Sequence, residues 1–141
     1  MSESIVVGTD GSDTAKRAVA EAVRLAKALG AELHVVSAYE PLRGAHVAGS
    51  SEVAPLPDDV VDSTLEQAAA VGRFSDVAVR THAVRSDPAE ALIDLAAEVG
   101  ASMIVVGNQG MHGAKRILGS VPNTVSHRAR CNVLIVATDA H

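Results

Sequence analysis

The chain has 141 residues and a formal net charge of −5 at pH 7; 48% of its residues are hydrophobic, whereas only 1% are aromatic. This length predicts one domain over residues 1–141, and the scarcity of aromatic side chains means that Val, Ala, Leu and Ile must fill its core. The acidic balance, together with the lack of a Lys/Arg-rich stripe or of aromatic rings for base stacking, argues against nucleic acid as the main partner.

The termini and the cysteine content bear on the compartment. The N-terminal sequence MSESIVVGTDGS has no cationic segment followed by a long apolar run, so it does not resemble a signal peptide. No apolar stretch approaches the ~20 residues that a membrane helix needs. The single cysteine, Cys131, cannot form an internal disulfide, which fits a reducing compartment. We therefore expect a soluble, cytoplasmic protein without a membrane partner.

Five short aliphatic runs alternate along the chain with segments of helical periodicity. The runs are residues 5–7, 33–36, 77–79, 103–106 and 133–136. Runs that are apolar almost throughout are typical of parallel strands covered on both faces. Strands that alternate with helices predict a single doubly wound α/β domain, with a parallel sheet, right-handed crossovers and helices on both faces.

The first predicted helix follows the turn sequence GTDGS. Small and aliphatic residues recur at spacings of three and four from Ala15 to Leu29, which places them on one helix face. Ser12 is a suitable N-cap, and Gly30 stands where the end of a helix favours a left-handed residue.

The middle of the chain contains a proline-rich segment and two further helices. Residues 40–58 hold three of the five prolines and predict a mobile loop. A second helix is expected from about residue 59 to 71. The third has Asp87 as its N-cap, Pro88 at the first helical position and Gly100 at its end.

Ligands of doubly wound sheets bind beyond the carboxyl ends of the strands. Gly8, Thr9 and Asp10 follow the first apolar run. Asp10 has two interpretations, which the spacing leaves open. It either stabilises a tight turn, or it accepts hydrogen bonds from a ribose or an adenine amine.

The segment GNQGMHGAKRILGSVPNT, residues 107–124, follows the fourth run. Glycines such as Gly107, Gly110 and Gly119 let backbone amides approach a phosphate closely. A helix then begins, with Ser120 able to cap it and Pro122 in its first turn. Its free amides and positive dipole end predict an anion site, with two adjacent lysine and arginine residues nearby. The alternative is a flexible connection whose glycines only permit turning.

Other sites are not indicated. The segment is neither a P-loop nor a G-x-G-x-x-G fingerprint, and the chain has no G-x-S-x-G nucleophile elbow. The six histidines have no ligand-like spacing with each other or with the cysteine. We therefore expect no metal site and no catalytic residues.

The stretches VVGTDGS and VVGNQGMHGAKRILGSVPNTVSHRARCNVLIV resemble the universal stress protein family, and the resemblance covers nearly the whole chain. It implies a five-stranded parallel sheet in the order 3-2-1-4-5. It also implies a homodimer through the last strand, Val133–Val136. Family members with this glycine motif bind ATP or another adenine nucleotide.

The resemblance further implies which residues would meet the nucleotide. Gly8, Thr9 and Asp10 would contact the adenosine, with Val35 near the adenine ring. Val106 and Gly107 would line the ribose side. The phosphates would be held by Gly110, Gly119, Ser120, Val121 and Pro122. The loop is one residue shorter than the family pattern between its second and third glycines, which leaves open whether ATP (with Mg²⁺), AMP or cyclic AMP is preferred.

These observations predict a regulatory stress-response protein that binds an adenine nucleotide and works as a homodimer. The alternative is a structural or partner-binding stress protein with a vestigial pocket. A slow ATPase ranks last, because Asp10 is the only candidate general base.

Overall fold

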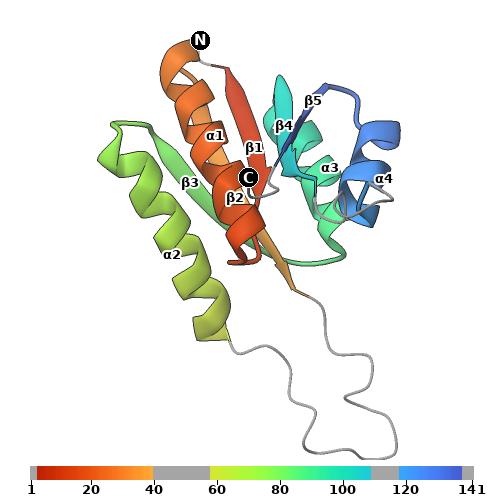
Figure 1. Cartoon of the computed structure of the whole chain (residues 1–141), viewed down its shortest axis with the longest axis horizontal. Helices are drawn as coiled ribbons and strands as arrows, with labels where there is room; N and C mark the ends of the chain where they lie inside the picture. Colours follow the sequence, from red (N-terminus) through yellow and green to blue (C-terminus); the bar gives the residue numbers. More distant parts are fainter. Residues whose placement is uncertain (1–2, 40–57, 109–117, 138–141) are drawn as a thin grey trace, which may run out of the picture.

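The computed structural model of the protein describes residues 3–39, 58–108 and 118–137. Strands and helices alternate, as Figure 1 shows, in the order β1 (Ser4–Gly8), α1 (Asp13–Leu29), β2 (Glu32–Tyr39), α2 (Asp58–Phe74), β3 (Val79–Arg85), α3 (Pro88–Val99), β4 (Met103–Gly107), α4 (Ser120–Arg128) and β5 (Asn132–Val136). The loop predicted over residues 40–58 lies outside the described residues, apart from Asp58, at which α2 begins. None of the described helices is long and apolar enough to cross a membrane.

All the described strands run parallel, and their order across the sheet is β3-β2-β1-β4-β5, as the family resemblance implies. The chain moves outward from β1 through β2 to β3. It then crosses to β4, on the other side of β1. The strand order therefore reverses between β1 and β4, and the crevice at their carboxyl ends is where a sheet of this kind binds its ligand.

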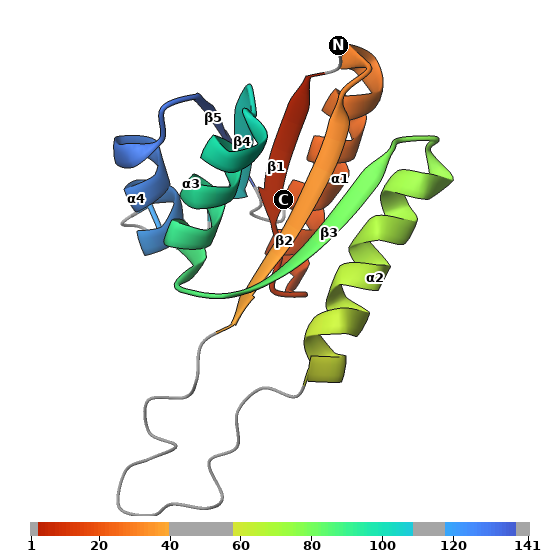
Figure 2. The same ribbon diagram turned by 180° about the vertical axis from the view of Figure 1, so that it is seen from behind.

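The two faces of the sheet carry separate parts of the core. Ile5 and Val7 of β1 pack with α1 and α2, whereas Val6 between them packs with α3 and α4. Figures 1 and 2 show these two helix pairs on opposite faces. Strand side chains alternate between the faces, so each strand contributes to both layers.

Local capping chemistry fixes the ends of α1 and α3 as predicted. Ser12 Oγ accepts the Ala15 amide at 3.2 Å, and a carboxylate oxygen of Asp87 accepts the Glu90 amide at 3.1 Å. The closing residues Gly30 and Gly100 adopt φ values of 65° and 64°. That left-handed conformation is accessible to glycine without the steric cost that a Cβ would bring.

Two predicted elements differ in extent from the observed ones. β3 begins at Val79, where the prediction ended, because this edge strand alternates exposed and half-buried residues instead of forming an apolar run. α2 extends to Phe74, past Gly72. Gly72 fits the helix because it packs directly against Val79, and a Cβ there would overlap the Val79 side chain.

Candidate functional site

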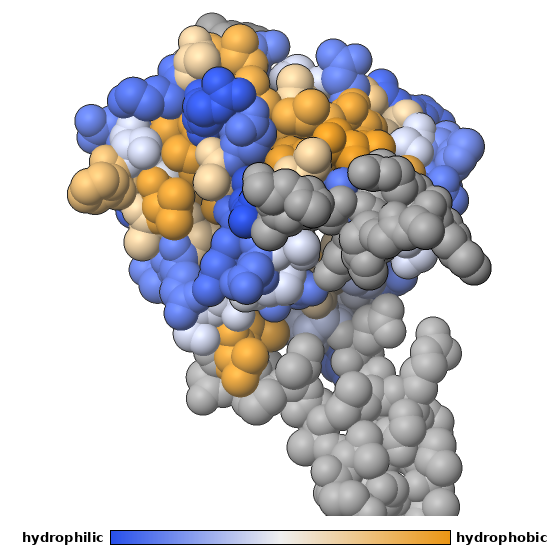
Figure 3. Space-filling model, in the orientation of Figure 1, coloured by the Kyte–Doolittle hydropathy of each residue, from blue (hydrophilic) through white to orange (hydrophobic). Residues whose placement is uncertain are grey.

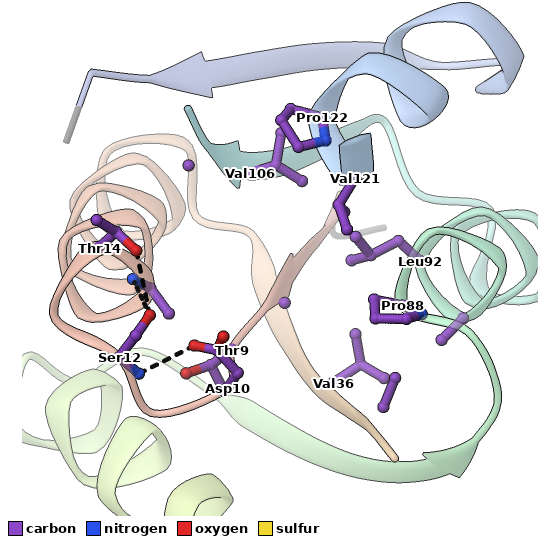
Figure 4. A pocket seen from close by; sticks show the side chains of 15 residues that line it. Thr9, Asp10, Ser12, Thr14, Val36, Pro88, Leu92, Val106, Val121 and Pro122 are labelled. Carbon is purple, nitrogen blue, oxygen red and sulfur yellow. Dashed lines mark hydrogen bonds between the residues drawn. The ribbon is translucent and has the colours of Figure 1, made fainter. Parts of the chain in front are cut away.

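A cavity of about 190 Å³ lies at the carboxyl ends of β1 and β4, at the reversal of strand order. Figure 4 shows that its walls come from the turn after β1, the end of β2, the start of α3, and the β4–α4 region. The cavity is thus built from segments far apart in the sequence.

The turn after β1 is held by its own side chains. The Thr9 amide donates to the Val36 carbonyl at 2.9 Å, which extends the contact between β1 and β2. Thr9 Oγ1 accepts the Gly11 amide at 3.1 Å, and Asp10 Oδ1 accepts the Ser12 amide at 2.9 Å. Gly11 has a φ of 83°, where a side chain would be strained. The turn interpretation of Asp10 is therefore confirmed.

Asp10 also lines the cavity, and it is exposed. Within the described residues, the turn engages Oδ1 of its carboxylate, and no hydrogen bond is found at Oδ2. The turn thus fixes the position of the carboxylate at the cavity wall. The structural interpretation and the ligand-binding interpretation are compatible with each other.

Two hydroxyl groups at the start of α1 extend this polar wall. Ser12 Oγ and Thr14 Oγ1 lie 3.1 Å apart, and Figure 4 shows both at the cavity. The sequence indicated Ser12 only as a cap and gave Thr14 no role. A hydroxyl in the first turn of a helix after a candidate ligand turn is a signal that could have identified Thr14.

The opposite wall is apolar and comes from β2 and α3. Figure 4 shows Val36 of β2 on the same side of the cavity as Pro88 and Leu92 of α3, and Ala38 and Ala91 also line the cavity. This contribution of α3 could not be predicted from the sequence, because an apolar stripe on a helix predicts a core contact and does not specify which part of it borders a cavity.

Gly8 allows β1 to approach this apolar wall. A Cβ on Gly8 would lie 3.2 Å from Cδ2 of Leu92, closer than side chains normally pack. Leu92 is only 3% exposed, and it would have to shift by a few tenths of an ångström to accept that Cβ. The glycine that ends β1 therefore allows close packing between strand and helix.

The predicted contact of Val35 is not supported by its position. Val35 is fully buried in the core layer of α1 and α2, on the other face of the sheet from the cavity. Its neighbour Val36 lines the cavity instead. The alternation of side chains along β2 explains the difference.

The α4 side of the cavity is lined by Val106, Gly107, Val121 and Pro122. The prediction that Ser120 caps α4 is wrong. Ser120 is the first helical residue, and the residue before it, a glycine, occupies the cap position without a side chain.

The start of α4 leaves backbone donors near the cavity. The first hydrogen bond within the helix joins the Asn123 amide to the Gly119 carbonyl at 3.0 Å. The amides of Ser120 and Val121 precede it and have no acceptor within the helix. Neither Gly119 nor Ser120 lines the cavity, whereas Val121 does. The predicted contribution of Gly110 lies outside the described residues.

Among the described residues that line the cavity, only Asp10 is ionisable. In the three described ranges no group of three or more His, Cys, Asp or Glu side chains could hold a metal ion. Hydroxyls, one carboxylate, backbone amides and an apolar slot can bind a small polar molecule with a flat apolar part.

Comparisons with known proteins identify related chains. A model described as the universal stress protein family matches residues 1–137. Universal stress protein Rv1636 of Mycobacterium tuberculosis is 39% identical over 146 residues, covering 96% of this chain and 97% of its own. Universal stress protein YxiE of Bacillus subtilis is 34% identical over 150 residues, covering 96% of this chain and 99% of its own.

Solved structures share the fold over almost the full chain. A universal stress protein crystallised in complex with cAMP has a TM-score of 0.77 and 36% identity, with 98% of each chain covered. The universal stress protein from Archaeoglobus fulgidus in complex with dAMP has a TM-score of 0.72 and 25% identity, covering 94% of this chain and 96% of its own.

Proposed function

Since this chain belongs to the universal stress protein family, we propose that its cavity binds an adenine nucleotide and that the bound state regulates a stress response. The observation that carries this proposal is the position of the cavity. It lies at the reversal of strand order, between a carboxylate-bearing turn and a helix start whose first amides have no acceptor within the helix. Two structural relatives bear cAMP and dAMP, which are both adenine nucleotides.

Different walls of the cavity suit different parts of such a ligand. The apolar slot that includes Ala38 and Leu92 suits the flat adenine ring. Asp10, which lines the cavity, would accept hydrogen bonds from hydroxyl groups of the ribose. The amides of Ser120 and Val121, at the positive end of the α4 dipole, suit a phosphate. Mg²⁺ would accompany ATP through its phosphates.

We also propose that the protein works as a homodimer through β5. Within the described residues, the backbone of β5 pairs with β4 on one side only, and Val133–Val136 are uncharged and half-buried. Figure 3 shows apolar surface on the part of this face where β4 and β5 lie. The other edge strand, β3, carries exposed Arg80 and Arg85, which discourage pairing. A second copy would cover the β5 edge in a two-fold arrangement.

The proposal is for binding without a dedicated catalytic function. Nucleotide hydrolysis needs a positioned base, an activated nucleophile or a metal centre. Among the described residues that line the cavity, Asp10 is the only ionisable one, and one oxygen of its carboxylate is engaged in the turn. A regulatory module therefore fits the site better than an enzyme.

The direct test is to identify what the protein carries and binds. Mass spectrometry of small molecules released from freshly purified, denatured protein should find an adenine nucleotide. Calorimetric titration with ATP, AMP and cyclic AMP should then give saturable binding and rank the three. If none of them binds at millimolar concentration, the vestigial-pocket alternative replaces this proposal.

A further inference from the structure

A row of hydrogen-bonded polar side chains links β2 to β3 outside the cavity. His34 is 4% exposed, and its Nδ1 lies 3.0 Å from Nε2 of His82. The other ring nitrogen of His34, Nε2, lies 3.0 Å from Oε1 of Glu32. Arg80 Nε donates to the second oxygen of Glu32 at 2.9 Å. The two imidazole rings are stacked, with their centroids 5.2 Å apart.

Whether all the hydrogen bonds of this row can form depends on the number of protons that the histidine pair carries. With both imidazoles neutral, His34 donates from Nε2 to Glu32, and its Nδ1 accepts the Nε2 proton of His82. One added proton is tolerated, because it can occupy the outer nitrogen of His82. A second added proton places an N–H on each of the two nitrogens that face each other, so neither can accept and their hydrogen bond is lost.

The surroundings of the pair disfavour the doubly charged state. Burial, and next the neighbouring His34, lower the pKa of His82. The charge of Arg80 on β3 lowers this pKa further, whereas Glu98 of α3 and Glu32 of β2 raise it. The net shift is downward, so the folded protein resists full protonation of the pair.

The position of the pair in the fold gives its protonation a structural consequence. His82 belongs to β3, the outermost strand of the sheet on this side. In the ladder it lies opposite Val36, which lines the cavity. Loss of the bond between the imidazoles would therefore weaken the attachment of an edge strand next to the cavity wall.

We propose that His34 and His82 form an acid-sensitive latch between β2 and β3, which holds with zero or one added proton and releases when a second is bound. The proposal is independent of whether the cavity binds a nucleotide. It assigns a function to two histidines for which the sequence alone indicates no ligand-like spacing.

The pH dependence of stability follows from the linkage between proton binding and unfolding. In the unfolded chain both histidines protonate near a pKa of about 6.5. The folded state excludes one of those protons, so the unfolded state binds more protons and stability falls with falling pH. Between about pH 7.5 and about pH 6.0 the unfolding equilibrium constant should rise about fourfold for one excluded proton. Both conditions stay above the pI of about 5.6, which limits precipitation.

The test compares urea unfolding of the full chain at these two pH values, at one fixed protein concentration. His82→Gln retains an N–H donor for His34 but cannot titrate, and its amide can turn to accept a proton from a charged His34. This variant should lose most of the fourfold change. The matched control is His127→Gln, on the exposed surface of α4, which should keep the full change. Equal pH dependence in wild type and His82→Gln would overturn the proposal.

A second measurement does not depend on the stability of any variant. Long-range ¹H–¹⁵N spectra of the wild-type imidazoles follow the protonation of each ring nitrogen. The pair should bind its second proton at a lower pH than the histidines of the urea-unfolded chain, whose pKa is about 6.5. If both rings of the folded pair become fully protonated at the same pH as in the unfolded chain, the latch does not exist.

Discussion

Replacing Asp10 by asparagine or alanine separates the two roles of this carboxylate. Oδ1 accepts the Ser12 amide at 2.9 Å and closes the turn, while the residue also lines the cavity. Asparagine keeps an oxygen for the turn but removes the negative charge. Alanine removes both.

The expected magnitudes differ for binding and for stability. Loss of a charge-assisted hydrogen bond to the ribose in Asp10→Ala should cost about 1.5–3 kcal/mol, roughly a ten- to hundred-fold loss of affinity. Asp10→Asn can still make a neutral hydrogen bond and should fall between alanine and wild type. Only the alanine variant loses the turn hydrogen bond, at about 0.5–1.5 kcal/mol of unfolding free energy, and the exposure of the site favours the lower end.

Calorimetric titration with AMP, paired with urea unfolding of each variant, measures both effects. The order wild type, asparagine, alanine is expected for affinity, and only alanine should lose measurable stability. If Asp10→Ala binds AMP as tightly as wild type, then Asp10 has no ligand role and its function is confined to the turn.

The cap of α4, the edge of β5 and the interior of α2 give three further predictions. Gly119→Val should lower affinity for AMP and ATP toward that for adenosine, because the proposed phosphate position is at the start of α4, next to this residue. The φ of −63° at Gly119 is open to any residue, so the fold should persist. Titration with all three ligands tests this, and an unchanged phosphate contribution would show that the reasoning is wrong. Ile135→Pro should give a folded monomer in analytical ultracentrifugation, and a dimer of unchanged affinity contradicts the proposed interface. The Val136 carbonyl accepts the Asn108 amide, and the direction of the backbone groups alternates along a strand. Ile135 therefore points its backbone groups away from β4. Those of Leu134 point toward β4, so Leu134→Pro should unfold the chain instead. Gly72→Ala should destabilise the protein by about 1–3 kcal/mol in urea unfolding, because its Cβ would overlap Val79, and a gain in stability from helix propensity would refute this.

Features that depend on short-range chemistry could be predicted from the sequence. The caps Ser12 and Asp87 and the closing glycines Gly30 and Gly100 act through hydrogen bonds and backbone angles within a few residues. The alternation of apolar runs and helices was sufficient for the fold class, and the family resemblance supplied the strand order. The start of β3 could not be located in the same way, since an edge strand has no need of an apolar run.

The features that the sequence could not supply depend on register and on distances between elements. Residues 33–36 are apolar except for His34, so the pattern does not indicate which of Val35 and Val36 faces which layer. That choice is made by pairing, in which the Thr9 amide meets the Val36 carbonyl. The apolar wall of α3 could not be predicted for a similar reason, because the contact of Leu92 with Gly8 depends on the position of the helix relative to the strand.

The contact between the two histidines could not be predicted from the sequence, whereas the cavity could be predicted in part. His34 and His82 are 48 residues apart, and their contact depends on the pairing of β2 with β3. Residues at the carboxyl ends of strands can be grouped without knowing the register, because every parallel strand ends at the same side of the sheet. Side chains in the middle of strands meet only when the register is known. Ligand-binding loops at the strand ends of this fold are therefore easier to predict from the sequence than side-chain contacts within its sheet.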